Sequence, residues 1–403
     1  MATTACSTSD RSSSGGGGAG KAPGVTDTTI KVGGVNTKTT TFGFSQAGVD
    51  IGFKARIERA NAEGGVNGRT IKFVGIEDDN GDQAKSLAAT RKLVEQEQVF
   101  AVAPVESIAF GGGGFLKQNN VPYLGWGYLP DFCDNPIAFG FNGCLAPKPG
   151  SGATAGTAPY NALDQALGGA QGKTVAIIGA DDPASKAVIE LGRTSATKQG
   201  FTVTLADASL PQQQVPTDWS PYVRKILGSN NGKAPDVVVS MTNAPFNTGL
   251  FSALKASGYK GTLMESISYR DSLLQNPQTR DAYQGVLISA QIEPLLAVTM
   301  GARQMKADLE KVAGPDFAWT QDMAIGYATA DVFLAILKAA GRDLTRDGFV
   351  KAAQGLRIES PIGGEISFPE GHAGTNSCAS LVRVEGTRFL PVASLLCGPT
   401  FQV

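Results

Sequence analysis

The chain contains almost no histidine: His372 is the single one among 403 residues. A catalytic triad built on histidine therefore has no credible base, since His372 lies in the turn-like segment 369–372. The five cysteines form no C-x-x-C pair, and with one histidine they do not make a zinc site. These absences argue against an enzyme, and we expect no metal and no cofactor.

An excess of charge of either sign is also missing. The 35 Lys and Arg residues are balanced by 36 Asp and Glu residues, which leaves a net charge of −1 and no basic field to attract nucleic acid or anionic lipid. No run of about 18 consecutive apolar residues occurs, which argues against a transmembrane helix. The glycine run 111–114 lacks the lysine and hydroxyl residue of a phosphate-binding P-loop.

What the sequence does contain is a regular alternation of strand and helix patterns. In the segment 46–61, Val49, Phe53 and Ile57 recur on one helical face, between a strand near Ile30 and a second strand at 71–76. Such alternation predicts a parallel sheet with helices on both faces. The next expected elements are helix 82–96, strand 99–103, helix 108–118 and strand 121–125.

The same alternation resumes after the Pro/Gly-rich stretch 146–152, which we expect to carry the chain into a second lobe. A chain of this length exceeds the usual size of a single core. The elements expected in the second lobe are strands 174–178, 201–205, 237–241 and 262–264 and helices 185–198, 218–227 and 247–257. Strand 286–291 should return the chain to the first lobe, to which helices 298–312, 321–340 and 346–355 add their apolar faces.

Several segments resemble the substrate-binding proteins of branched-chain amino acid ABC transporters, which are Leu/Ile/Val-binding-like proteins of the type I periplasmic binding fold. The most specific are "IKVGGV", "ARIERANAEGGVNGRTIKFVGIEDD" and "DQAKSLAATRKLV", and the likeness continues more loosely to about residue 384. The resemblance implies an α/β fold of two doubly wound parallel-sheet lobes, joined by a three-strand hinge with a ligand cleft between them. It places the third crossing of the hinge near 381–385.

The resemblance also implies a division of the chain. Residues 1–25 would form a lipoprotein-like N-terminus and a Ser/Gly tether, residues 26–148 with 292–382 the first lobe, and residues 149–291 with 383–403 the second lobe.

The cysteines carry two further expectations. Their spacing and an export-like N-terminus favour the disulfides Cys133 with Cys144 and Cys378 with Cys397, although four reduced buried thiols are the alternative. Cys6 lies in a segment similar to a bacterial lipoprotein processing site and is followed by a Ser/Gly tract, although Thr3 stands where a leucine is usual. We expect Cys6 to be lipidated; the alternative is a free cysteine in a tail.

Ligands of open α/β sheets lie beyond the carboxyl ends of the strands, so loops that follow strands supply the candidate binding residues. The resemblance places Ser107 on a ligand carboxylate, at the start of a helix, and Gly127 in a second carboxylate-holding loop. Ser107 could equally serve as an ordinary helix N-cap. The full set of candidates is Phe42, Glu106, Ser107, Trp126, Gly127, Tyr128, Asp181, Asn243, Phe246, Glu265 and Tyr269.

Two departures from the family pattern bear on the ligand. Ala184 and Asn243 stand where the family usually carries aromatic side chains, and both changes enlarge the cleft. An amino acid ligand needs a carboxylate for its ammonium group, a role that Glu265 or Asp181 could fill. If neither faces the cleft, an aromatic or hydrocarbon-bearing acid without an amine is favoured.

We therefore expect an extracytoplasmic solute-binding protein that captures a small carboxylate-bearing ligand and delivers it to an ABC transporter permease. The protein would be a monomer that meets the membrane only through a lipid anchor at Cys6. The alternative is a sensory or regulatory protein of the same fold that signals through a partner.

Overall fold

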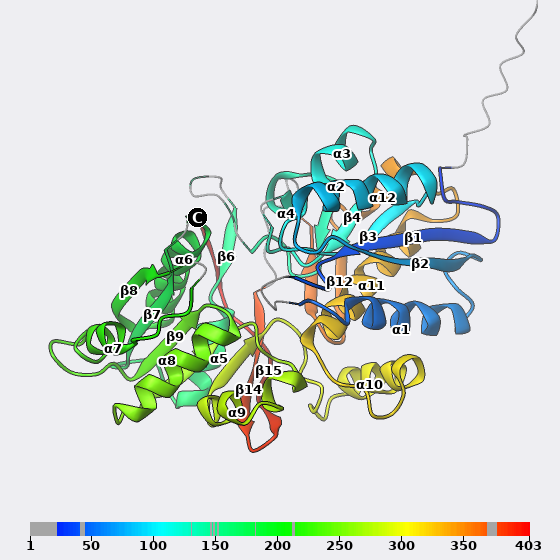
Figure 1. Ribbon diagram of the computed structural model, residues 1–403. Coiled ribbons are helices and arrows are strands. Elements are labelled where there is room, and N and C mark those ends of the chain that lie inside the picture. The colour runs from blue at the N-terminus through cyan, green and yellow to red at the C-terminus, as the bar shows by residue number, and fades with distance from the viewer. Residues whose placement is uncertain are drawn as a thin grey trace, which may run out of the picture.

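The computed structural model describes residues 22–40, 45–129, 131–145, 147, 150, 153–181, 183–211, 214–368 and 377–403. Two separate sheets organise these residues into two lobes (Figure 1). The first sheet has the order β2-β1-β3-β4-β5, and all its pairs are parallel. Its strands are β1 (Thr29–Asn36), β2 (Thr70–Asp78), β3 (Ala101–Glu106), β4 (Tyr123–Gly125) and β5 (Ala138–Gly140).

Helices cover both faces of the first sheet, as the alternating pattern predicted. Helices α2 (Gln83–Arg91) and α3 (Gly113–Gln118) lie on one side, and α1 (Val49–Ala62) and α11 (Gln321–Ala340) on the other (Figure 1). Helix α2 continues as a π-helical turn, Lys92–Gln96. The remaining helices of this lobe are α4 (Asp131–Asp134), α10 (Met300–Ala313) and α12 (Arg346–Ala353), with the hairpin β12 (Arg357–Ser360) and β13 (Gly364–Ser367).

Helix α11 is apolar around almost its whole circumference, and most of its residues are buried. By length and composition it is the one helix in the described part of the chain that could cross a membrane, although it is mostly buried inside the protein. The helix contains no uninterrupted apolar run of 18 residues, because Asp322 and Asp331 lie within it. Both carboxylates have arginine partners, Arg270 for Asp322 and Arg56 for Asp331.

Two glycines allow α1 and α11 to cross at close range. A Cβ atom on Gly52 would lie 1.7 Å from the Met323 carbonyl oxygen, and one on Gly326 would lie 2.0 Å from the Val49 carbonyl oxygen. Only residues without a Cβ fit at these two positions. The crossing fixes the N-terminal turn of α11, and with it Asp322, against the residues that precede α1.

The second sheet has the order β15-β14-β11-β10-β9-β7-β8, with β14 and β15 antiparallel at one edge. Its parallel strands are β7 (Thr174–Ala180), β8 (Thr202–Leu210), β9 (Val237–Met241), β10 (Thr262–Glu265) and β11 (Leu287–Ala290). The two antiparallel strands are β14 (Cys378–Glu385) and β15 (Arg388–Cys397), and β15 forms the edge. Helices α5 (Ala158–Leu167), α6 (Pro183–Gln199), α7 (Ser220–Leu227), α8 (Ala244–Ala256) and α9 (Pro277–Tyr283), with a 3₁₀ turn at Asp271–Leu274, complete this lobe.

The chain passes between the sheets at places that differ in part from the expectation. The first passage lies between β5 and β6 (Thr154–Gly156), and β6 pairs with β16 (Thr400–Gln402). The passage expected at 381–385 instead precedes Cys378, because β14 pairs with β11 of the second sheet from Ser380 to Arg383. Residues 378–382 thus belong to the second sheet, whereas the sequence had suggested the first lobe.

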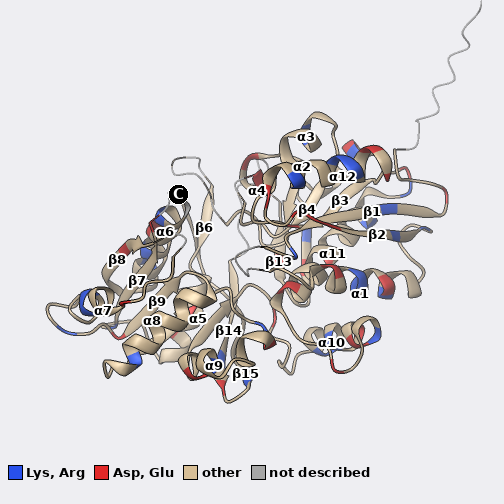
Figure 2. Cartoon of the chain, viewed as in Figure 1, with Lys and Arg blue, Asp and Glu red and all other residues tan. Residues whose placement is uncertain are grey.

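Both expected cysteine pairs are bonded, Cys133 to Cys144 and Cys378 to Cys397. Cys378 and Cys397 face each other across the β14–β15 ladder, where the sheet register brings them together. Cys6 lies outside the described residues. Basic and acidic residues are interspersed over both lobes, with no large area of one sign in this view (Figure 2).

Candidate functional site

A cleft of about 390 Å³ lies between the two sheets. Its size falls within the range of small-molecule sites in proteins. Loops that follow β4, β10 and β11 line it, together with one face of α6 and the first turns of α5 and α11. The carboxyl ends of strands from both sheets thus meet at one site, as the fold predicts for a ligand cleft.

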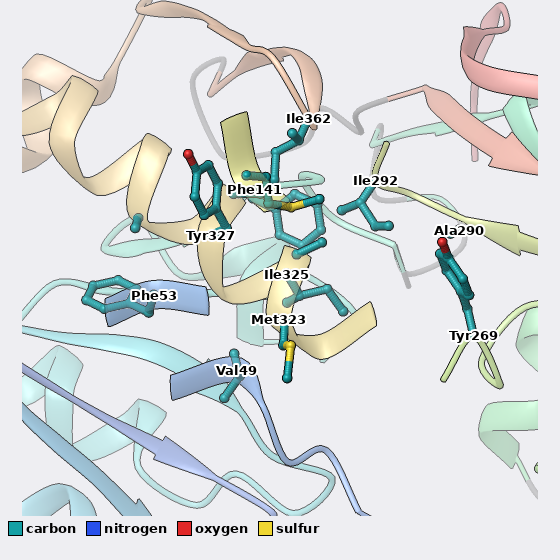
Figure 3. Packing of buried hydrophobic residues seen from close by; sticks show 14 of the residues in the cluster. Val49, Phe53, Phe141, Tyr269, Ala290, Ile292, Met323, Ile325, Tyr327 and Ile362 are labelled. Carbon is teal, nitrogen blue, oxygen red and sulfur yellow. The ribbon is translucent and has the colours of Figure 1, made fainter. Parts of the chain in front are cut away.

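The walls of the cleft are largely apolar, and aliphatic side chains outnumber aromatic ones. Helix α6 contributes Val188 and Leu191, on the same face as Gly192 and Ser195. From the first lobe come Phe141 and, near the start of α11, Ile325 (Figure 3). Ile292, which follows β11, lines the cleft as well. The other large apolar side chains are Ile108, Trp126, Tyr128, Leu145, Tyr160, Val239, Met241, Met264 and Ile267.

One end of the cleft is polar, and Arg270 is its centre. Arg270 follows β10 of the second sheet, and its guanidinium reaches the first lobe: Nη1 donates to the Ser45 carbonyl at 2.5 Å, and Nη2 lies 3.3 Å from Asp322 Oδ2. The neighbouring backbone holds Arg270 in place, since Asp271 N donates to the Trp319 carbonyl and Gln321 N to the Tyr269 carbonyl, each at 2.9 Å.

Three further groups surround this ion pair. Gln46 Nε2 lies 3.4 Å from both Glu106 Oε1 and the Tyr128 hydroxyl. Glu106 is fully buried and hydrogen-bonded to Asp322, and burial raises the pKa of Glu106 well above its ordinary value, with the Asp322 charge adding to the effect. Burial also raises the pKa of Asp322, which Arg270 opposes. Burial and the neighbouring Asp322 charge therefore both favour the protonated form of Glu106.

A second polar contact joins the lobes. Gln291, which follows β11, accepts at Oε1 from Trp126 Nε1 at 2.9 Å and from Asn142 Nδ2 at 2.7 Å. The indole ring packs edge-on against Tyr128 with the centroids 4.8 Å apart. The aromatic wall of the first lobe is thus held by a residue of the second.

The structure brings some of the first-lobe candidates together at the cleft. Trp126 and Tyr128 line it, and Glu106 lies directly behind Gln46. Ser107 is fully buried: its hydroxyl donates to Asp79 and accepts from Ala109 N at 3.1 Å. Gly127 N donates to Asn142 Oδ1, and its Cα packs so tightly that an added Cβ would lie 1.7 Å from the Gly143 carbonyl oxygen. Phe42 lies outside the described residues.

The second-lobe candidates are not among the residues that line the cleft. Asp181 is exposed and pairs with Lys186 at 2.6 Å. Asn243 caps α8, and Phe246 is buried against Trp219. Tyr269 is buried between Trp319 and Phe389.

The carboxylate of Glu265 accepts hydrogen bonds from the loop that follows it. It accepts hydrogen bonds from Ile267 N, Ser268 N and Ser268 Oγ at 3.0 to 3.1 Å and lies 3.3 Å from Asn247 Nδ2. The side chain is fully buried, and burial raises its pKa to about 7. Glu265 therefore shapes the turn that presents Ser266 and Ile267 to the cleft.

Sequence reasoning missed the residues that form the polar end: Gln46, Arg270, Gln291, Gln321 and Asp322. The sequence could have pointed to Arg270, since it lies six residues past the predicted strand 262–264 and next to the candidate Tyr269. Asp322 had none, because an acidic residue in the first turn of a helix is ordinary.

Two doubly wound lobes with an apolar cleft between the carboxyl ends of their strands define a two-lobed solute-binding protein. The chain belongs to the periplasmic binding protein family, whose pattern matches residues 29–388. Membership implies an extracytoplasmic binding protein of a transport system, not an enzyme. No curated protein sequence matches the chain.

Solved structures with the same type I periplasmic binding fold cover almost the whole chain. A fatty acid ABC transporter substrate-binding protein from Thermomonospora curvata is 18% identical over 94% of this chain and 95% of its own, with a TM-score of 0.67. A branched-chain amino acid ABC transporter protein from Thermus thermophilus with bound valine is 17% identical over 92% and 96%, with a TM-score of 0.66. A solute-binding protein from R. palustris in complex with 4-hydroxybenzoate is 20% identical over 93% and 97%, with a TM-score of 0.64.

Proposed function

We propose that this protein captures an amine-free carboxylic acid with an aliphatic or aromatic body and delivers it to an ABC importer. The observation that carries the proposal is the composition of the cleft: long apolar walls and one polar end that contains an arginine. The apolar body of such an acid would replace water along α6 and β9, and burial of each methylene group contributes about 0.8 kcal/mol.

The acidic residues explain why an amino acid fits less well. An α-ammonium group buried in this cleft needs a carboxylate partner. Glu265 caps its own loop and Asp181 pairs with Lys186. Asp322 is the acidic side chain among the described lining residues, and Arg270 already neutralises it.

The fold supports delivery by closure of the lobes. Arg270 and Gln291 each reach from the second sheet to the first lobe. A ligand that contacts them would therefore favour one relative arrangement of the two lobes over another. Ligand binding shifts such an equilibrium only by its differential affinity for the two arrangements. We propose that the ligand-bound arrangement is the one that the permease recognises, with Cys6 as a lipid anchor and the protein acting as a monomer.

A thermal-shift screen tests the ligand class. The oxidised protein is screened against alkanoates of 6 to about 14 carbons, hydroxybenzoates, and the amino acids valine, leucine and phenylalanine. A ligand at about 100 times its dissociation constant stabilises the bound form by about 2.7 kcal/mol, which raises the melting temperature measurably. Stabilisation by the amine-free acids alone supports the proposal, and stabilisation by amino acids alone refutes it.

A further inference from the structure

Arg270 is the basic residue among the described residues that line the cleft, and it already holds a carboxylate. Its partner Asp322 is 1% exposed as a side chain, and Arg270 is 19% exposed. The ion pair therefore sits at the border between the protein interior and the cleft. A carboxylate entering from the cleft side would meet the guanidinium before any other charged group of that lining.

The surroundings of the pair are incomplete in hydrogen bonds. Gln46 lines the cleft, is 2% exposed, and its Oε1 atom has no hydrogen-bond partner among the described residues. Glu106 Oε2 likewise accepts no hydrogen bond there, although its carboxyl group is hydrogen-bonded to Asp322. Native proteins rarely leave buried polar atoms unpaired, because each costs about 1 to 3 kcal/mol. The polar end is thus built for a group that completes it.

We propose that Arg270 is the anchor for the ligand carboxylate and that Asp322 occupies this anchor when no ligand is bound. The proposal rests on the proposed function, because it assumes an acid as the ligand. The ligand carboxylate displaces Asp322 from the guanidinium or shares the guanidinium with it, and the apolar body extends toward α6. An arginine suits this task because its planar fork binds a carboxylate in two-point fashion and remains charged at every relevant pH.

Displacement of Asp322 from Arg270 by the ligand also changes the protonation of Asp322. The titratable groups that face Asp322 are Glu106 at the end of β3 and Arg270 after β10. Tyr128 also interacts electrostatically with Glu106, Asp79 and Asp322. Arg270 holds the pKa of Asp322 down against the effect of burial. Once the ligand takes Arg270, the pKa of Asp322 rises, so binding takes up protons and the affinity increases as the pH falls.

The test compares an acid with its uncharged amide, octanoate against octanamide, by calorimetry on the whole oxidised protein. Replacing Arg270 by Met is expected to weaken octanoate binding at least about 30-fold, as for loss of a partner from a buried charge pair, and to change octanamide binding less than about 3-fold. The double variant Arg270→Met with Asp322→Asn removes both charges together. It keeps the test valid if the single variant does not fold.

Arg193→Met is the matched control. Arg193 is an exposed arginine of α6 that pairs with Glu190 and is not among the cleft-lining residues. This variant should leave both affinities unchanged. Asp322→Asn should bind octanoate more tightly than the natural protein does and should abolish proton uptake, measured as the difference in binding heat between phosphate and Tris buffers.

The proposal is overturned if the double variant binds octanoate within about 3-fold of the natural protein, or if Asp322→Asn leaves proton uptake intact. Failure of the proposed function looks different, because the natural protein would then bind leucine and no alkanoate. In that case the same variants are tested with leucine against leucinamide, and an equal loss for both compounds would overturn the role of Arg270.

Discussion

The buried carboxyl of Glu265 makes the stability of the second lobe depend on pH in a predictable way. Burial raises its pKa to about 7 from the ordinary 4.5, because desolvation outweighs the hydrogen bonds that Glu265 accepts. Folding thus favours the protonated form. The stabilisation is complete below about pH 4.5 and is lost as the pH rises through 7, since the native state must then ionise a buried group.

The magnitude follows from the two pKa values. The difference between about 7 and 4.5 corresponds to about 3.4 kcal/mol, at about 1.4 kcal/mol for each pH unit. Between pH 5.5 and pH 8 the natural protein should lose about 2 kcal/mol of stability through this group. A Glu265→Gln variant cannot ionise and should lose none of it.

The assay is urea denaturation of both proteins at pH 5.5 and pH 8, followed by fluorescence. Other buried carboxyls titrate equally in both proteins and cancel in the difference. The gap in unfolding free energy between the variant and the natural protein should shift by about 2 kcal/mol in favour of the variant at pH 8. An exposed control, Glu359→Gln, should show no shift. Parallel pH profiles for Glu265→Gln and the natural protein would refute the reasoning.

Two further substitutions separate structural roles from binding roles. Ser107→Ala should cost about 1 to 3 kcal/mol of stability, because Asp79 loses the hydroxyl that donates to it. The variant should leave ligand affinity unchanged in a titration. A tenfold loss of affinity at full stability would show that Ser107 touches the ligand. Gly52→Val should destabilise the protein by about 3 kcal/mol or more in calorimetry, because its Cβ would meet the Met323 carbonyl at 1.7 Å. Gly114→Ala, where a Cβ meets nothing within 4 Å, should be close to neutral, and equal melting temperatures for the two glycine variants would contradict the close crossing.

The sequence predicted most strands of both sheets, although not β5 or β15, because most of them are short buried runs that alternate with helices. The strand expected at 237–241 is β9 itself, and the helix expected at 321–340 is α11 itself. The third passage between the lobes was expected at 381–385 but precedes Cys378, because an apolar strand such as β14 has the same sequence pattern in either sheet. Pairing with β11 assigns β14 to the second sheet, and the sequence alone does not predict that pairing.

The candidate site was predicted only in part, and the reason is geometric. Counting residues past a strand identified the loops that reach the cleft, and Trp126 and Tyr128 do line it. The same count could not say which way a side chain points within a tight turn. Glu265 and its neighbour Ser266 differ by one position, yet one caps the turn and the other faces the cleft. Arg270 gains its position from a backbone bridge to Thr320, which joins segments 50 residues apart in sequence.

The two disulfides each place one cysteine in the cleft wall, Cys144 from the first lobe and Cys378 from the second. The shape of the binding surface is therefore completed by an oxidation step and not by folding alone. Protein produced in a reducing compartment would carry thiols at two points of that surface, without the covalent links that hold those points in place. The compartment in which the protein folds thus helps to determine the structure of its cleft wall.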